Sequence, residues 1–233
     1  VEKWLEDKKK SGQIGQVGFS YHGNSEMFCA LVDAFDWDFC QIQYNYLDEH
    51  SQAGRKGLHH AHSKGLPVII MEPLRGGALA NPPADIRALM ENHEPKKSAV
   101  EWAFSYIADY AEVATILSGM SNQQQLEENL KVFDHLTVGG LTAEDKAFIK
   151  ELKKAYLARI PIGCTGCRYC MPCPNGVNIP GIFSAWNQMS LYNQNPKDNW
   201  GYGQIVLNGE TADKCVACGA CEAACPQHLG IID

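Results

Sequence analysis

Cysteines are the residues of this 233-residue chain whose spacing most directly implies chemistry. Eight of its ten cysteines lie in two tight runs: Cys164, Cys167, Cys170 and Cys173, then Cys215, Cys218, Cys221 and Cys225. Cysteines this close rarely reach acceptable disulfide geometry, so the runs are not those of a secreted disulfide scaffold. Clustered thiolates are typical of metal ligands and of a reducing compartment, and we therefore expect a cytoplasmic protein.

The spacing within the second run indicates the kind of metal centre. Cys215-x-x-Cys218-x-x-Cys221-x-x-x-Cys225-Pro226 resembles the run with which bacterial ferredoxins bind [4Fe–4S] clusters. The first run is a near copy with one residue fewer before Cys173. Two tetrahedral zinc sites are the alternative, but zinc sites usually separate their cysteine pairs by a loop. We therefore predict two [4Fe–4S] clusters.

In two-cluster ferredoxins, the fourth cysteine of each run binds the cluster of the other run. This rule predicts two ligand sets: Cys164, Cys167, Cys170 and Cys225 for one cluster, and Cys215, Cys218, Cys221 and Cys173 for the other. The two remaining cysteines, Cys29 and Cys40, are expected to be buried small apolar residues. The uneven distribution also predicts two domains, with an α-rich, ferredoxin-type iron–sulfur domain at residues 161–233.

Residues 1–160 alternate between strand and helix patterns. The expected strands are 14–20, 39–45, 67–71 and 113–118. The expected helices are 26–35, 57–63, 84–92, 96–108, 123–136 and 142–157. This alternation predicts an α/β domain with four parallel βα units. Four units fit either an open doubly wound sheet or half of a barrel, since a full eight-stranded barrel takes about 250 residues.

Two of these elements carry more specific expectations. In the helix at 123–136, we expect Leu126, Leu130, Val132 and Phe133 on the buried face, and a capping box formed by Ser121 and Gln124. In the strand at 39–45, period-two alternation places Gln41, Gln43 and Asn45 on one face. Amides there need polar partners, which are either a bound carboxamide or one another and water.

The composition narrows the class of partner. An apolar content of 45% can supply a sizeable core and excludes a disordered chain. The net charge is −7, from 20 basic and 27 acidic residues, which argues against nucleic acid or an anionic membrane as the main partner. The longest apolar runs, such as residues 66–71, fall far short of the roughly 20 residues that a membrane span needs.

Four segments of the first domain occur in a characteristic order. They are Gly15-Gln-Val-Gly-Phe-Ser20, Phe39-Cys-Gln-Ile-Gln-Tyr-Asn45, Met71-Glu-Pro-Leu-Arg-Gly-Gly77, and Leu117-Ser-Gly-Met-Ser-Asn122 followed by Gln125-Leu-Glu-Glu-Asn129. This order resembles the fifth to eighth strands of the aldo/keto reductase family. The resemblance covers about residues 10–136 and implies that residues 1–160 are the carboxyl-terminal half, the last four βα units, of a (β/α)8 TIM barrel. It also implies an NADP or NAD cofactor lying across the carboxyl ends of these strands.

The resemblance further implies ten cofactor-binding residues in three groups along the nucleotide. Its nicotinamide end would contact Ser20, Gln41 and Met71, the last in place of the aromatic residue that usually stacks on the ring. Its pyrophosphate would lie along Leu74, Arg75 and Gly76. Its adenosine end would contact Gly119, Ser121, Glu128 and Asn129. No Lys or Arg stands at the positions that usually bind the 2′-phosphate, so the resemblance does not decide whether the cofactor is NADH or NADPH.

The family's catalytic Asp, Tyr, Lys and His come from its first four strands, which have no counterpart in this sequence. We therefore assign no catalytic residue and expect the isolated chain to be inactive. The chain is expected to be the carboxyl-terminal part of a longer reductase; half-barrel ancestry or a separate second subunit is the alternative. Its two open sheet edges should be covered by the missing amino-terminal half or by a partner chain. Apolar residues such as Val17, Phe19, Ile69 and Ile116 are expected to face the barrel interior.

The function that follows is an oxidoreductase of aldo/keto reductase type. Nicotinamide moves two electrons as hydride and a cluster moves one, so two clusters can exchange electrons with the hydride site or with an external electron carrier. The alternative is a non-catalytic electron-carrier or structural metal-binding module that docks on a partner.

Overall fold

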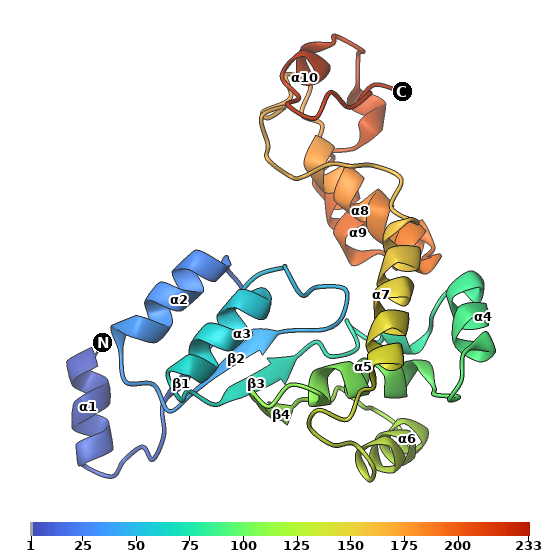
Figure 1. The fold of residues 1–233 in the computed structure, drawn as a ribbon. Helices are drawn as coiled ribbons and strands as arrows, with labels where there is room; N and C mark the ends of the chain where they lie inside the picture. The colour runs from blue at the N-terminus through green and yellow to red at the C-terminus, as the bar shows by residue number, and fades with distance from the viewer. Residues whose placement is uncertain (1) are drawn as a thin grey trace. The chain divides into compact units, whose positions relative to one another are not determined.

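A computed structural model describes residues 2–233 of the chain and divides them into two compact units (Figure 1). The first unit ends at Lys153, and the second is Lys154–Asp233. Among the described residues, no helix combines the length and the apolar character that a membrane crossing requires.

The first unit alternates strands with helices along nearly its whole length. Its elements are α1 (Glu2–Lys10), β1 (Gly18–Tyr21), α2 (Ser25–Ala34), β2 (Phe39–Gln43), α3 (Gly54–Ser63), β3 (Val68–Met71), η1 (Ala78–Ala80), α4 (Ala84–Asn92), α5 (Ala99–Ala108), β4 (Val113–Ile116), α6 (Gln123–Phe133) and most of α7 (Ala143–Leu157). Every expected strand and helix is present, although most are shorter than the sequence pattern predicts. Helix α1 is an addition that the pattern did not predict.

The four strands form one sheet in the order β1-β2-β3-β4, and each neighbouring pair is parallel. A doubly wound sheet reverses its strand order at a switch point, whereas this sheet does not. Sequential parallel strands, each followed by a helix, are the arrangement found in a (β/α)8 barrel. The fold is therefore α/β with four βα units of a partial barrel, which confirms the predicted fold class.

One face of the sheet is covered by helices. Burial alternates along β2 and β3, so that Cys40, Ile42, Val68 and Ile70 are fully buried. This alternation is typical of strands whose two faces meet different surroundings.

Two residues that were expected to face the barrel interior lie on this helix-covered face instead. The ring of Phe19 lies 5.8 Å from that of Phe28 in α2, measured between centroids. Ile116 packs against a cluster of buried residues that includes Phe104 of α5. The prediction for Phe19 and Ile116 is therefore wrong. The register explains the error, because Phe19 pairs with buried Cys40, and paired residues on adjacent strands share a face.

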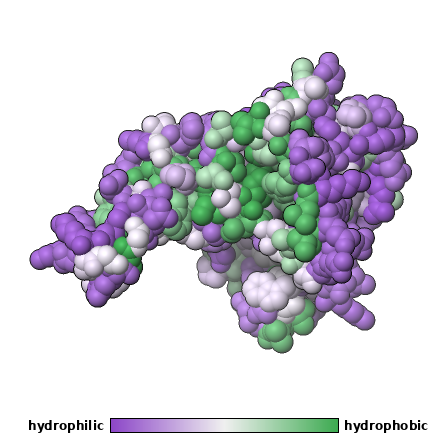
Figure 2. Space-filling view, turned by 90° about the horizontal axis from the view of Figure 1, so that it is seen from below, coloured by the Kyte–Doolittle hydropathy of each residue, from purple (hydrophilic) through white to green (hydrophobic). Residues whose placement is uncertain are grey.

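The opposite face carries the side chains that alternate with the buried set. Ser20, Gln41, Ile69 and Met71 are all exposed or half-buried, and the register pairs Ser20 with Gln41 and Gln41 with Ile69. Figure 2 shows apolar side chains gathered where the strands lie, with hydrophilic residues around them. This face would form part of the lining of a closed barrel.

Helix α6 corrects two further expectations. Its N-cap is Asn122 rather than Ser121: the Asn122 side chain accepts a hydrogen bond from the Gln125 backbone N–H at 2.9 Å. Val132 is buried as expected, but the side chains expected beside it are exposed. Leu126 is 40% exposed, Leu130 62% and Phe133 42%. The helix buries the face that meets α5, and no described element covers its leucine face.

The second unit contains short helices and long connecting segments. After the end of α7, its elements are α8 (Ile179–Tyr192), η2 (Pro196–Asp198), α9 (Trp200–Leu207), η3 (Ala212–Lys214) and α10 (Ala220–Ala223). Asparagine side chains hold the segments together. Asn187 of α8 accepts from the Ile162 N–H at 3.1 Å and donates to the Ile162 carbonyl at 2.8 Å. This pair of bonds anchors the chain just before the first cysteine run.

Candidate functional site

The loops at the carboxyl ends of β3 and β4 enclose a groove of about 610 Å³. Seven of the ten residues expected to bind a nucleotide line it: Met71, Leu74, Gly76, Gly119, Ser121, Glu128 and Asn129. They come from two segments that are distant in sequence, the loop after β3 and the turn leading into α6. Parallel strands bring these segments together because their carboxyl ends meet at one edge of the sheet. We call this cavity the nucleotide groove.

Ser20 and Gln41 lie beside Met71 on the open face of the sheet. The Gln41 Nε2 donates to Ser20 Oγ at 3.4 Å and lies 3.5 Å from Met71 Sδ. The register produces this arrangement, since Ser20 and Gln41 are partners across β1 and β2. The structure thus brings together the three residues expected at the nicotinamide end.

Gln43 and Asn45, the other amides on that strand face, are hydrogen-bonded within the chain. Gln43 Nε2 donates to Asp48 Oδ2 at 2.9 Å, and Asn45 Nδ2 donates to the same oxygen at 3.0 Å. The partner of both side chains is therefore a carboxylate of the chain itself, which neither expected alternative included. Asp48 is a nearly buried polar residue that the sequence interpretation missed, although its position just after a strand of amides is a usable signal.

Arg75 is directed to Asp48 and does not line the nucleotide groove. Its Nε lies 3.2 Å from Asp48 Oδ2, so the ion pair joins the loop after β3 to the loop after β2. The next residues, Gly76 and Gly77, have φ values of 64° and 86°. Glycine adopts this left-handed region without the steric cost that a Cβ would bring. The tight turn and the ion pair together set the path of this loop past the groove.

The end of the groove at which adenosine is expected is fixed by hydrogen bonds at the start of α6. Gln125 Oε1 accepts from the Ser121 backbone N–H at 2.8 Å, and Asn129 Nδ2 donates to Ser118 Oγ at 2.9 Å. Asn129 is 9% exposed and so holds the turn from inside. Glu72 and Glu128 are the ionisable residues that line the groove, and no Lys or Arg does. The groove is therefore an acidic site.

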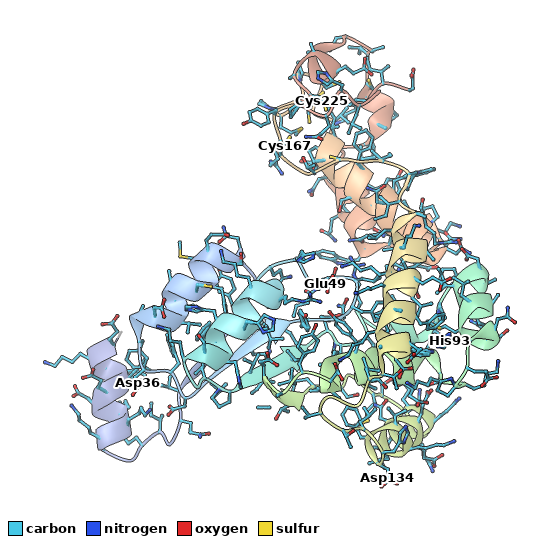
Figure 3. All side chains as sticks on the ribbon, viewed as in Figure 1. Asp36, Glu49, His93, Asp134, Cys167 and Cys225 are labelled. Atoms are coloured by element: carbon cyan, nitrogen blue, oxygen red, sulfur yellow. The ribbon has the colours of Figure 1, made fainter. Side chains whose placement is uncertain are left out.

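The eight clustered cysteines line two cavities of the second unit. One cavity is lined by Cys170, Cys173, Cys215, Cys218 and Cys221. The other is lined by Cys164, Cys167, Cys170 and Cys225. Each cavity combines thiols of one run with the last cysteine of the other, and Figure 3 shows Cys167 and Cys225 at the same end of this unit. Apolar residues such as Ile179 and Phe183 line both cavities.

The two runs follow the same backbone path. Residues two and four positions after the first cysteine have positive φ in both: Gly166 and Arg168 in one run, Ala217 and Gly219 in the other. Each run also ends in a turn closed by a backbone hydrogen bond, Gly176 N–H to Cys173 O at 2.9 Å and His228 N–H to Cys225 O at 3.1 Å. Positive φ at Arg168 and Ala217 costs free energy, so the repeated path indicates a shared constraint.

The donor set of these cavities fits iron–sulfur clusters. It consists of soft thiol sulfurs in an apolar surrounding, and Ala217 N–H donates to Cys215 Sγ at 3.4 Å, the type of bond that tunes a cluster. Both Cys170 and Cys221 are half-buried, and burial is the largest cause that raises the pKa of each thiol. Among residues 2–233, no three His, Cys, Asp or Glu side chains stand at mutual metal-binding geometry.

The two isolated cysteines differ from each other. Cys40 is fully buried, as expected, and burial raises the pKa of its thiol to about 12. Cys29 is only half-buried, so the expectation of a buried residue is wrong there. It lies on α2, whose buried residues are Phe28 and Val32.

Comparisons with known proteins match both parts of the chain. The sequence model of the aldo/keto reductase family matches residues 1–154, and that of the 4Fe-4S dicluster domain matches residues 163–229. Among solved structures, the holo and apo forms of aldo-keto reductase AKR11C1 from Bacillus halodurans are similar, each with a TM-score of 0.54 and 21% identity. Each match covers 65% of this chain, and 54% or 55% of the matched chain. A search of curated proteins finds no match. The chain thus spans about half the length of the structures that it resembles.

Proposed function

We propose that this chain, which belongs to the aldo/keto reductase family and carries a 4Fe-4S dicluster domain, is the nucleotide-binding half of an NAD(P)-linked oxidoreductase. The observation that carries the proposal is the nucleotide groove, because seven of ten independently expected residues line one cavity. The catalytic residues would come from a barrel half that this chain does not contain.

The residues of the first unit have separable tasks in this proposal. Gln41 offers an amide for a nicotinamide carboxamide, and Met71 provides an apolar surface for the ring. Asn129 holds the turn of the adenosine end, and Gly76 lets the backbone approach the pyrophosphate. These residues bind and orient the nucleotide, whose hydride would be transferred on the open face of the sheet.

The second unit would hold two [4Fe–4S] clusters in the crosswise sets. One set is Cys164, Cys167, Cys170 and Cys225; the other is Cys173, Cys215, Cys218 and Cys221. The lining of the two cavities supports these sets, as does the repeated backbone path. Bound clusters supply one-electron transfer. The apolar lining around the thiols would limit the access of water, which affects a cluster's potential.

The proposed protein partners follow from the two uncovered edges of the sheet. The edges of β1 and β4 each lack a neighbouring strand among the described residues. A missing amino-terminal barrel half, on the same polypeptide or on a partner chain, would cover both. An external electron carrier would receive or supply the electrons of the clusters, and the setting would be the reducing cytoplasm.

The test is an anaerobic titration of the cluster-loaded chain with NADH and with NADPH. Nucleotide binding is followed by the fluorescence of the reduced nicotinamide, and the redox state of the clusters by their absorption. We expect saturable nucleotide binding and a cluster band that dithionite bleaches reversibly. A redox-silent metal together with no nucleotide binding would contradict the proposal and favour a structural metal-binding module.

A further inference from the structure

A second cavity of the first unit lies apart from the nucleotide groove and shares no lining residue with it. It has a volume of about 360 Å³, within the size range of small-molecule sites. Its walls come from α3, the end of α5, α7 and the loop that follows β2. We call it the outer cavity.

Cations outnumber carboxylates among the residues that line the outer cavity. The lining cations are Arg55, Lys146, Lys150 and Lys153, and the lining carboxylates are Glu49 and Asp109. The cavity also touches His59, which pairs with Glu112 at 2.8 Å and so has its own acidic partner. Four positive charges against two negative charges leave an excess of two positive charges.

Both carboxylates are already engaged by lining cations. Glu49 accepts hydrogen bonds from Arg55 and Lys153, and from the Tyr106 hydroxyl at 2.9 Å. Figure 3 shows Glu49 between α3 and α7. Burial alone would raise the pKa of Glu49, but Lys153, Tyr106 and Arg55 outweigh burial and lower it. Asp109 pairs with Lys146 at 2.9 Å. Each acid is thus already paired with a lining cation, so neither is free to neutralise more charge.

Donors nevertheless remain unsatisfied at this cavity. The Nε of Arg55 is buried without a hydrogen-bond partner in the part of the chain that the structure describes. In the same described part, Lys150 has no carboxylate partner. Lys146, Lys150 and Lys153 recur at helical spacing along one face of α7, and all three line the cavity. A buried donor without an acceptor costs free energy that a bound acceptor would recover.

The remaining lining is apolar and aromatic. The rings of Tyr106 and Tyr110 lie 5.4 Å apart between centroids, and Ile149 of α7 adds an aliphatic wall. The Tyr110 hydroxyl donates to that of Tyr106 at 3.2 Å, so hydroxyl groups also face the cationic residues. Convergent polar groups inside a largely apolar cavity are the usual composition of a ligand site.

We propose that the outer cavity binds a dianionic phosphate group, either inorganic phosphate or the phosphate of a small monoester. Phosphate carries a charge close to −2 at neutral pH and has several acceptor oxygens. Its charge matches the positive excess, and its oxygens would accept from Lys150, Lys153 and the Nε of Arg55. A monoester would in addition place its organic group against Tyr110 and Ile149.

The experiment titrates the full chain with inorganic phosphate, and separately with phenyl phosphate, at constant ionic strength. Binding is measured calorimetrically for the wild type, Lys150→Gln and Lys154→Gln. Lys150 is the lining cation without a partner, so its replacement should leave the fold intact. Lys154 is an exposed lysine of the same helix that does not line the cavity, which makes it a matched charge control. We expect saturable binding that Lys150→Gln weakens at least fivefold and that Lys154→Gln leaves within twofold.

The two ligands distinguish the source of the phosphate. Tighter binding of phenyl phosphate would indicate a monoester, and equal binding would indicate inorganic phosphate. Acetylation of lysines, followed by mass spectrometry, provides a second readout: phosphate should slow the modification of Lys150 and not that of Lys154. The proposal is overturned if neither ligand binds saturably, or if both variants lose affinity equally, since that would be a general charge effect.

Discussion

Gln41 and Glu128 show how single residues would set the chemistry of the nucleotide groove. Gln41 lies between Ser20 and Met71 on the open face of the sheet. Its hydrogen bond to Ser20 is long, at 3.4 Å, and therefore weak, so a ligand can replace Ser20 as the partner of the Gln41 amide. Glu128 is a half-buried acid at the other end of the groove. One residue provides a hydrogen bond and the other a charge, so their replacements should have different consequences.

Replacing Gln41 by alanine should weaken nucleotide binding by about 1 to 3 kcal/mol, because the nicotinamide carboxamide would lose a hydrogen-bond partner. Isothermal titration with NADH and NADPH measures the effect. Gln123→Ala is the matched control, since Gln123 is an exposed glutamine on α6 that does not line the groove. Equal affinities for the wild type and Gln41→Ala would show that Gln41 takes no part in binding.

The acidic lining of the groove should favour NADH over NADPH. The additional 2′-phosphate of NADPH would meet Glu128 with no lining Lys or Arg to compensate. We expect Glu128→Gln to improve the affinity for NADPH by about 1 kcal/mol, as for a single partly exposed charge pair, and to change the affinity for NADH little. The ratio of the two dissociation constants is the measurement. A wild type that prefers NADPH, with no change of the ratio in the variant, would contradict this assignment of the adenosine end.

At the scale of elements, short polar networks determine how helices begin and where the cysteine runs lie. Asp145 is a good example, because it exchanges hydrogen bonds with Thr142, the residue before α7, and also pairs with a residue of another segment. Its backbone N–H donates to Thr142 Oγ1 at 3.0 Å, and its carboxylate accepts from Lys97 at 2.8 Å. Both side chains of the ion pair are nearly buried. The network joins the start of α7 to the segment before α5.

Asp145→Asn should lower the free energy of unfolding by about 1 to 3 kcal/mol at neutral pH, since it removes a charged partner of Lys97. Burial would raise the pKa of Asp145, but Lys97 and Thr142 outweigh burial and lower it. A depressed pKa stabilises the fold above the unfolded value of 3.8, and this contribution is lost as the pH falls through the folded pKa.

Urea unfolding at neutral and at acid pH tests this expectation for Asp145. The difference between wild type and Asp145→Asn should shrink on acidification. Glu144→Gln, an exposed acid in the same helical turn, is the control and should have little effect at either pH. A difference that is independent of pH would assign the effect to packing rather than to the ionised carboxylate.

The crosswise cysteine sets give an element-scale prediction about metal content. Anaerobically prepared chain should contain about 8 iron and 8 sulfide, as expected for two [4Fe–4S] clusters. Cys225→Ser and Cys173→Ser should each impair one cluster and lower the iron content by up to half. Cys29→Ser, outside both runs, should not change it. Stoichiometric zinc without acid-labile sulfide would contradict the cluster assignment.

At the scale of the whole molecule, the first unit exposes surfaces that a closed barrel would cover. The edges of β1 and β4 have no strand partner among the described residues, and the leucine face of α6 is exposed. Exposed sheet edges and apolar faces favour association with another chain. Such surfaces should therefore govern the behaviour of the isolated chain in solution.

We expect the isolated chain to associate with itself or with a supplied amino-terminal barrel half, and to reduce no carbonyl substrate unaided. Leu130→Gln should weaken the association without lowering stability much, because Leu130 is 62% exposed. Lys131→Gln on the same helix is the control. Sedimentation and carbonyl-reduction assays provide the measurements. A monodisperse monomer that reduces carbonyls would overturn the half-barrel assignment.

The sequence by itself determined the features that depend on neighbouring residues. Cysteine spacing indicated the metal chemistry of residues 164–225, and alternating patterns located all four strands within a few residues. These signals are local, because ligand spacing and strand or helix periodicity are properties of consecutive residues. The four ordered segments of the first unit also pointed to the correct family.

Only the tertiary structure decided which faces and which distant residues meet. Register placed Phe19 and Ile116 under helices, and the surroundings of α6 left Leu130 in solvent. The outer cavity joins Glu49, Arg55 and Lys150, which are up to about a hundred residues apart in the chain. None of these three outcomes can be read from periodicity, because each depends on long-range packing between helices and strands. Charge pairing and burial are set there by neighbours that the local sequence does not contain.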